Sequence, residues 1–129
     1  MGTPDTSATT HIGTVAERTG LSLRTLRHWD EVGLVTPSGR SHGGFRLYTE
    51  SDVERILLVR RMKPLGFTLE EMADLLDVAG RLAAGPSGPD GAELRVRLDE
   101  FVAVARERRA DLARKLAMAD ELIALLDGV

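Results

Sequence analysis

The C-terminal third of the chain constrains the fold most, because it has the pattern of one uninterrupted amphipathic helix. From Glu93 to Leu126 the sequence contains no Gly or Pro, so a helix there is about 50 Å long at ~1.5 Å per residue. Nine positions follow alternating steps of four and three, and all but Arg109 are apolar: Leu98, Val102, Ala105, Arg109, Leu112, Leu116, Ala119, Ile123 and Leu126. A single helix cannot bury this stripe on itself. The eight apolar positions therefore predict a dimerisation seam, most simply a coiled coil between two copies of the chain.

A concentration of helix breakers precedes this helix. Residues 85–91 read Gly-Pro-Ser-Gly-Pro-Asp-Gly, which is typical of a flexible connection. We therefore predict a disordered leader at 1–10, a compact domain at 11–79, a linker at 80–92 and a dimerisation helix at 93–127. With 129 residues the chain has room for one core and an appended helix, which excludes a large multidomain enzyme.

The start of the compact domain predicts a helix-turn-helix. Two short amphipathic segments flank the turn Gly20-Leu21-Ser22, where the glycine ends the first helix and the serine caps the second. The side chains expected to point inward are Ile12, Val15, Ala16, Leu23, Leu26 and Val32. The side chains left outside on the second helix are Arg24, Thr25, Arg27 and His28.

The rest of the compact domain predicts a β-hairpin and two further helices. Residues 34–48 place an extended piece on each side of a Gly/Ser/Pro-rich tip. Thr49 and Thr68 each begin a Ser/Thr-x-x-acid pattern, which is typical of helix N-termini. We expect the third helix to end before Pro64 and the fourth at about residues 77–78. The predicted fold is mainly α, with a small β-hairpin wing.

Charge is distributed unevenly along the chain. The net charge is −3, yet residues 18–63 hold nine Lys/Arg against five Asp/Glu, a balance of +4. Residues 64–129 hold eight against thirteen, a balance of −5. The basic half is a candidate anion-binding surface.

The sequence does not support a disulfide, a metal site or a catalytic site. The chain has no cysteine, which excludes disulfides and thiolate metal sites and favours the cytoplasm, and we find no signal peptide or membrane span. His11, His28 and His42 lack the paired spacing of a metal site. The acidic pairs at 70–71 and 99–100 fit a helix N-terminus and a solvated helix face rather than a catalytic pair. We expect no enzyme activity, no metal and no cofactor.

The order of the predicted elements and five short motifs resemble the MerR family of transcription regulators. The motifs are Ile12-Gly-x-Val-Ala16, Gly20-Leu-Ser-x-Arg-Thr-Leu-Arg27, Asp30-Glu-x-Gly-Leu34, Gly44-Phe-Arg-Leu-Tyr48 and Leu65-Gly-Phe-Thr-Leu69. The resemblance covers about His11 to Asp77. It implies a winged helix-turn-helix DNA-binding domain followed by a long helix that forms an antiparallel coiled-coil dimer. The resemblance does not extend to metal sensing by thiolates, because this chain has no cysteine at the positions where metal-sensing family members have one.

By this resemblance, residues 22–32 would enter the major groove, and the hairpin and the turn at Lys63 would contact flanking phosphates. The predicted DNA-binding residues are Arg18, Ser22, Arg24, Thr25, Arg27, His28, Trp29, Arg40, Phe45, Arg46, Tyr48 and Lys63. Guanidinium groups can bond guanine edges or phosphates, and hydroxyls can donate to phosphates. For Ser22 a helix-capping role stays open, and for Trp29, Phe45 and Tyr48 a packing role does.

These features predict a sequence-specific regulator that binds a palindromic promoter operator as a homodimer and distorts the spacer DNA. Double-stranded promoter DNA and a second copy are the expected partners, RNA polymerase is an open further one, and no membrane is involved. The alternative is an architectural or recombination-directing DNA-bending protein with the same winged domain. A pure protein-interaction module is a third possibility, disfavoured by the arginines of the second helix.

Overall fold

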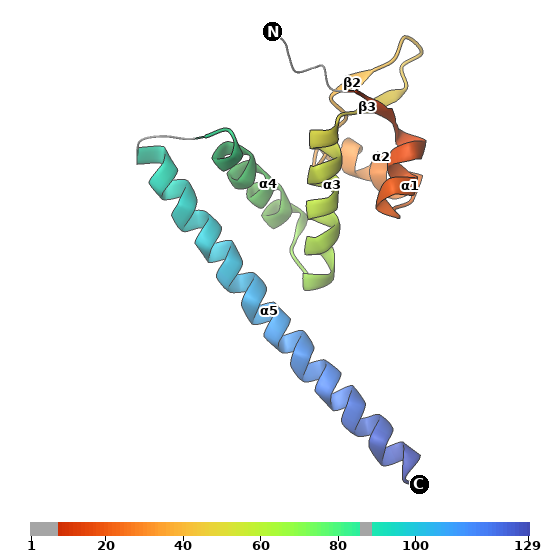
Figure 1. Cartoon of the computed structure of the whole chain (residues 1–129), viewed down its shortest axis with the longest axis vertical. Coiled ribbons are helices and arrows are strands. Elements are labelled where there is room, and N and C mark those ends of the chain that lie inside the picture. Colours follow the sequence, from red (N-terminus) through yellow and green to blue (C-terminus); the bar gives the residue numbers. More distant parts are fainter. Residues whose placement is uncertain (1–7, 86–88) are drawn as a thin grey trace. The chain divides into compact units, whose positions relative to one another are not determined.

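The computed structural model describes residues 8–85 and 89–129, which fall into two units divided between Leu76 and Asp77. The described residues are mainly helical, with one small antiparallel sheet (Figure 1). This confirms the predicted fold class of helices with a β-hairpin wing. None of the described helices combines the length and apolar character that crossing a lipid bilayer requires.

Helices α1 (Ile12–Thr19) and α2 (Leu23–Glu31) form the helix-turn-helix. Gly20 ends α1 with φ +71°, a left-handed conformation that strains other residue types. Ser22 caps α2, because its Oγ accepts a hydrogen bond of 3.0 Å from the backbone N–H of Thr25. The predicted turn and cap are therefore confirmed.

The sheet has three strands in the order β1-β3-β2. Strands β2 (Gly39–Arg40) and β3 (Arg46–Tyr48) are the hairpin, which we call the wing (residues 39–48), and they pair Arg40 with Arg46. Strand β1 (Thr10–His11) pairs with the other edge of β3, with Thr10 opposite Tyr48. The sequence missed β1, since Thr10 falls in the segment predicted as a disordered leader; residues 1–7 of that segment lie outside the described residues.

Helix α3 (Glu50–Met62) follows the sheet in the chain and is itself followed by the 3₁₀ turn η2 (Lys63–Leu65). Thr49 and Asp52 form the predicted capping box: Thr49 Oγ1 accepts from the Asp52 N–H, and Asp52 Oδ2 accepts from the Thr49 N–H. The core of the first unit draws on all three helices and the sheet. Its most deeply buried apolar side chains are Val15, Leu26, Val35, Tyr48, Val53, Ile56 and Val59.

Two inward predictions on α2 are wrong. Leu23 is 38% exposed and Val32 is 41% exposed, whereas Leu26 and Trp29 are buried. The helix has nine residues and buries only the narrow face that Leu26 and Trp29 share, three positions apart. Leu23 lies in the first turn at the edge of this face, and Val32 lies past the helix end.

The second unit contains the end of α4 (Leu69–Ala83) and the whole of α5 (Pro89–Asp127). Both helices extend into the predicted linker 80–92: α4 continues through Gly80 beyond its expected end, and α5 begins at Pro89, a residue suited to a first helical turn. Residues 86–88 of that linker lie outside the described residues. Helix α5 is continuous over 39 residues (teal to blue in Figure 1).

The apolar stripe of α5 is exposed over its C-terminal half. Every residue from 109 to 129 is exposed. The exposed fractions are 43% for Leu112, 65% for Leu116, 56% for Ile123 and 62% for Leu126. Leucines and isoleucines at such spacing are usually covered by a partner helix in a folded assembly.

Candidate nucleic-acid interface

The outer face of α2 carries free guanidinium groups. Arg24, Arg27 and His28 are exposed, on the side of the helix opposite Leu26 and Trp29. Within the described residues, neither Arg24 nor Arg27 makes an ion pair. All their N–H donors are therefore available to an external acceptor such as a base edge or a phosphate.

The first turn of α2 orders two hydroxyl groups. Ser22 Oγ donates to Thr25 Oγ1 at 2.9 Å, in addition to accepting from the Thr25 N–H. Ser22 is therefore a helix cap whose proton is engaged. The Thr25 hydroxyl accepts this bond, so its own proton remains able to donate.

A carboxylate of α2 holds both strands of the wing. Asp30 Oδ2 lies 2.6 Å from Arg46 Nε and 3.2 Å from Arg40 Nη2. The Asp30 side chain is 12% exposed and that of Arg46 is 25% exposed, so this contact is partly shielded from water. The hydrogen bond that Arg46 donates to Asp30 raises the pKa of Arg46. The sequence predicted that Arg40 and Arg46 contact DNA. It did not identify Asp30 as a functional residue or as the partner of these two arginines.

A second carboxylate secures the base of the wing. Asp52, which is buried, accepts from the Ser38 N–H at 3.0 Å and from Ser38 Oγ at 2.7 Å, besides its bond to Thr49. The chain entering β2 is thereby tied to the N-terminus of α3. The Ser/Thr-x-x-acid pattern predicted Asp52 as part of a cap, but no local signal points to Ser38.

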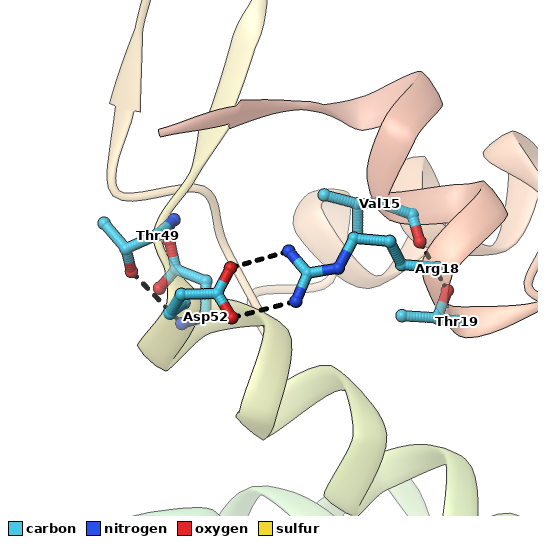
Figure 2. A network of polar contacts seen from close by, with 6 residues as sticks. Val15, Arg18, Thr19, Thr49 and Asp52 are labelled. Atoms are coloured by element: carbon cyan, nitrogen blue, oxygen red, sulfur yellow. Dashed lines mark hydrogen bonds and ion pairs between the residues drawn. The ribbon is translucent and has the colours of Figure 1, made fainter. Parts of the chain in front are cut away.

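Arg18 lies apart from the α2 face, in an ion pair between α1 and α3. Its guanidinium donates two hydrogen bonds, of 2.6 and 2.8 Å, to the two carboxylate oxygens of Glu50. Figure 2 shows Arg18 reaching from α1 toward the first turn of α3, where Thr49 and Asp52 lie. The hydrogen bond lowers the pKa of Glu50 and raises that of Arg18. The guanidinium that the sequence predicted to contact a phosphate is thus hydrogen-bonded to Glu50.

The three aromatic candidates divide between core and surface. Trp29 is 3% exposed and Tyr48 is 1% exposed, so both pack in the core, which is the role that the sequence left open for them. The buried Tyr48 Oη has no hydrogen-bond partner among the described residues, and burial raises the pKa of this phenol. Phe45 is 67% exposed near the tip of the wing, where its ring lies against Gly43.

Lys63 lies at the other end of α3. It is exposed at the start of η2, and the residues described by the structure include no ion-pair partner for it. The candidate interface includes Arg24, Thr25, Arg27 and His28 on α2, Arg40, Phe45 and Arg46 on the wing, and Lys63. DNA contact by Arg18 and Ser22, whose side chains are exposed but already hydrogen-bonded, stays a prediction. Within the described ranges, no group of three His, Asp or Glu side chains could hold a metal ion.

Comparison with known proteins defines the family. Residues 11–78 match the family described as "MerR HTH family regulatory protein", and residues 53–129 match "MerR, DNA binding". The transcriptional regulator CueR of Salmonella typhimurium is 32% identical over 118 residues, which cover 92% of this chain and 80% of CueR. The chain belongs to the MerR family. The resemblance seen in the five sequence motifs is thereby confirmed.

Other MerR-family relatives vary in length. The transcriptional activator TipA of Streptomyces coelicolor is 46% identical over 66 residues, which amount to 51% of this chain but only 26% of TipA. The structure of MtaN, the N-terminal part of a Bacillus subtilis multidrug transporter activator, is 30% identical with a TM-score of 0.55, covering 92% of this chain and 94% of MtaN. These relatives are transcription regulators and not enzymes.

One solved MerR-family structure is a complex. HiNmlR is described as a MerR family regulator lacking the sensor domain, bound to promoter DNA. It is 27% identical to this chain with a TM-score of 0.68, and the match covers 91% of this chain and 89% of HiNmlR.

Proposed function

We propose that this MerR-family protein regulates transcription by inserting α2 into the major groove of promoter DNA. The observation that carries the proposal is the pair of exposed guanidinium groups of Arg24 and Arg27 on the outer face of a capped helix, which have no ion-pair partner among residues 8–85 and 89–129. Arginine bonds the O6 and N7 atoms of guanine with two parallel hydrogen bonds, which distinguishes guanine from other bases. A helix held by its cap and its neighbours presents these groups in a defined orientation.

The wing fits a role on the sugar-phosphate backbone beside the groove. Because Asp30 joins α2 to both wing strands, the wing keeps a set position relative to the arginines of α2. Lys63 is proposed to contact phosphate from the turn after α3. Phosphate contacts of this kind set the register of a protein on the duplex without reading its sequence. The DNA complex of the relative HiNmlR supports DNA as the ligand.

We further propose that the active form is a homodimer paired through the α5 stripe. The exposed side chains Leu112, Leu116 and Ile123 support this, because a chain that leaves them uncovered gains stability when a second helix buries them. A two-fold dimer presents two copies of α2 and therefore matches a palindromic operator. The proposal includes an antiparallel pairing of the two helices and a cytoplasmic location. It divides the chain into a DNA-binding domain at 11–79, a linker at 80–92 and a dimerisation helix at 93–127.

Distortion of the promoter spacer is the proposed means of regulation. A dimer that grips two half-sites at a set separation stabilises the DNA shape that fits it, and the cost of that shape depends on the intervening sequence. RNA polymerase then binds the altered promoter.

The test is selection of duplexes from a random library with the full chain, followed by affinity measurement on the strongest duplex. We expect an inverted repeat, and we expect Arg27→Ala to weaken binding by roughly 1–3 kcal/mol. Arg81→Ala is the matched control, because Arg81 is an exposed arginine already paired with Asp77. Selection of no duplex, or equal affinity of Arg27→Ala and the wild type, contradicts the proposal. Footprints in arrays away from promoters favour the architectural alternative.

A further inference from the structure

Leu23, the first residue of α2, places an apolar side chain on an otherwise polar face of the helix. Leu23 follows the Ser22 cap and is 38% exposed, although leucine is usually buried. It lies four positions before Arg27, so the two side chains share one side of the helix. The core contacts of α2 are made by Leu26 and Trp29, at 1% and 3% exposure. Packing of the core therefore does not account for the outer part of the Leu23 side chain.

The position of Leu23 is where a recognition helix meets base edges. In helix-turn-helix proteins, the N-terminal residues of the second helix contact the bases. A leucine side chain has no hydrogen-bond donor or acceptor, so it can bond neither a phosphate nor a polar base atom. The apolar group that DNA presents in the major groove is the C5-methyl group of thymine.

We propose that Leu23 contacts the methyl group of a thymine in each half-site and is a specificity-determining residue. This inference rests on the proposed function, since it requires α2 in the major groove. It assigns the two kinds of discrimination to neighbouring side chains: Arg27 selects guanine by hydrogen bonds, and Leu23 selects thymine by burying its methyl group.

The chain contains a matched control for this leucine. Leu69 is also the first residue of a capped helix, α4, with Thr68 in the capping position and an exposed fraction of 44%. It belongs neither to α2 nor to the wing. A general effect of trimming an exposed leucine at a helix N-terminus should therefore appear equally in Leu23→Ala and Leu69→Ala.

The experiment uses the full chain and the strongest duplex from the random library. Each thymidine is replaced in turn by deoxyuridine, which removes the methyl group and keeps every hydrogen-bonding atom of the base. We expect one thymidine per half-site at which the replacement weakens wild-type binding by about fourfold, the effect of exposing one buried methyl group. In Leu23→Ala that sensitivity should vanish, and in Leu69→Ala and Leu23→Met it should persist.

The outcomes separate this inference from the proposed function. Binding of the duplex with no deoxyuridine-sensitive position, or sensitivity that survives in Leu23→Ala, overturns the role of Leu23 and leaves the proposed function standing. Selection of no duplex at all overturns the proposed function and this inference with it. A melting temperature of Leu23→Ala equal to that of Leu69→Ala establishes that the variant is folded.

Discussion

Asp30 Oδ2 on α2 lies 2.6 Å from Arg46 Nε on the wing, and this contact couples the two parts of the candidate DNA surface. Arg40 joins the same oxygen from the opposite wing strand at 3.2 Å. One carboxylate thus draws together two cations that would otherwise repel each other across the hairpin. The wing arginines are therefore structural as well as cationic, and α2 and the wing are expected to behave as one body.

Asp30→Asn is expected to lower the free energy of unfolding by about 1–2 kcal/mol, because a partly shielded carboxylate with two guanidinium partners is removed. Urea denaturation followed by circular dichroism measures this loss. Asp77→Asn is the control, since the Asp77 side chain is 48% exposed and pairs with one arginine on the same helix. We expect less than about 0.5 kcal/mol for the control. Equal losses in both variants would show that the Asp30 contacts contribute nothing beyond a surface ion pair.

The Arg18–Glu50 pair gives a prediction about pH. The pKa of Glu50 is lowered by its hydrogen bond to Arg18, so the unfolded chain takes up this proton at a higher pH than the folded chain. The stabilisation is therefore complete above the ordinary pKa of a glutamate and is lost as the pH falls through the lowered folded-state value. Urea midpoints measured from pH 7 down to pH 3 should decline more steeply for the wild type than for Glu50→Gln. Parallel declines would mean that the ion pair does not persist in solution.

Lys63→Ala should weaken binding to all duplexes by the same factor, because a phosphate contact carries no base information. The slope of log K against log salt concentration should become shallower by about one unit, as one counterion fewer is released. Fluorescence anisotropy at several salt concentrations measures both quantities. A loss confined to one sequence would instead make Lys63 a base-reading residue.

Substituting Leu116 and Ile123 together by Glu should convert the protein to a monomer. Both side chains lie in the exposed α5 stripe, and carboxylates there would face each other or apolar neighbours in a paired helix. Sedimentation equilibrium at micromolar concentration measures the mass. The control Ala113→Glu/Ala117→Glu adds the same charge at exposed positions of α5 outside the stripe. A dimeric stripe variant, or a monomeric control, would contradict the assigned seam.

The features that the sequence predicted correctly are local ones. The caps at Ser22 and Thr49 and the turn at Gly20 depend on neighbours within four residues, so short patterns are sufficient to find them. The long helix α5 was likewise predictable, because its apolar positions repeat at helical spacing within one continuous segment. The family motifs added the order of elements, which periodicity alone leaves open.

The features that the sequence missed are contacts between distant segments. Strand β1 exists because Thr10 pairs with Tyr48, and the ion pair of Arg18 joins residues 32 positions apart. A basic residue on a predicted surface looks free until its acidic partner is known, so the sequence could not show that Arg18 pairs with Glu50. The exposure of Leu23 was missed for a related reason: helical periodicity gives the direction of a side chain but not the width of the buried face.

Protection of guanine N7 from dimethyl sulfate on the selected duplex tests the placement of α2 most directly, because N7 lies in the major groove and is an acceptor for arginine. We predict protected guanines at two positions related by the dyad of an inverted repeat, with the protection lost in Arg27→Ala and retained in Arg81→Ala. If no guanine N7 is protected by the bound wild type, or if Arg27→Ala gives the wild-type pattern, α2 does not read the major groove through Arg27 as we propose.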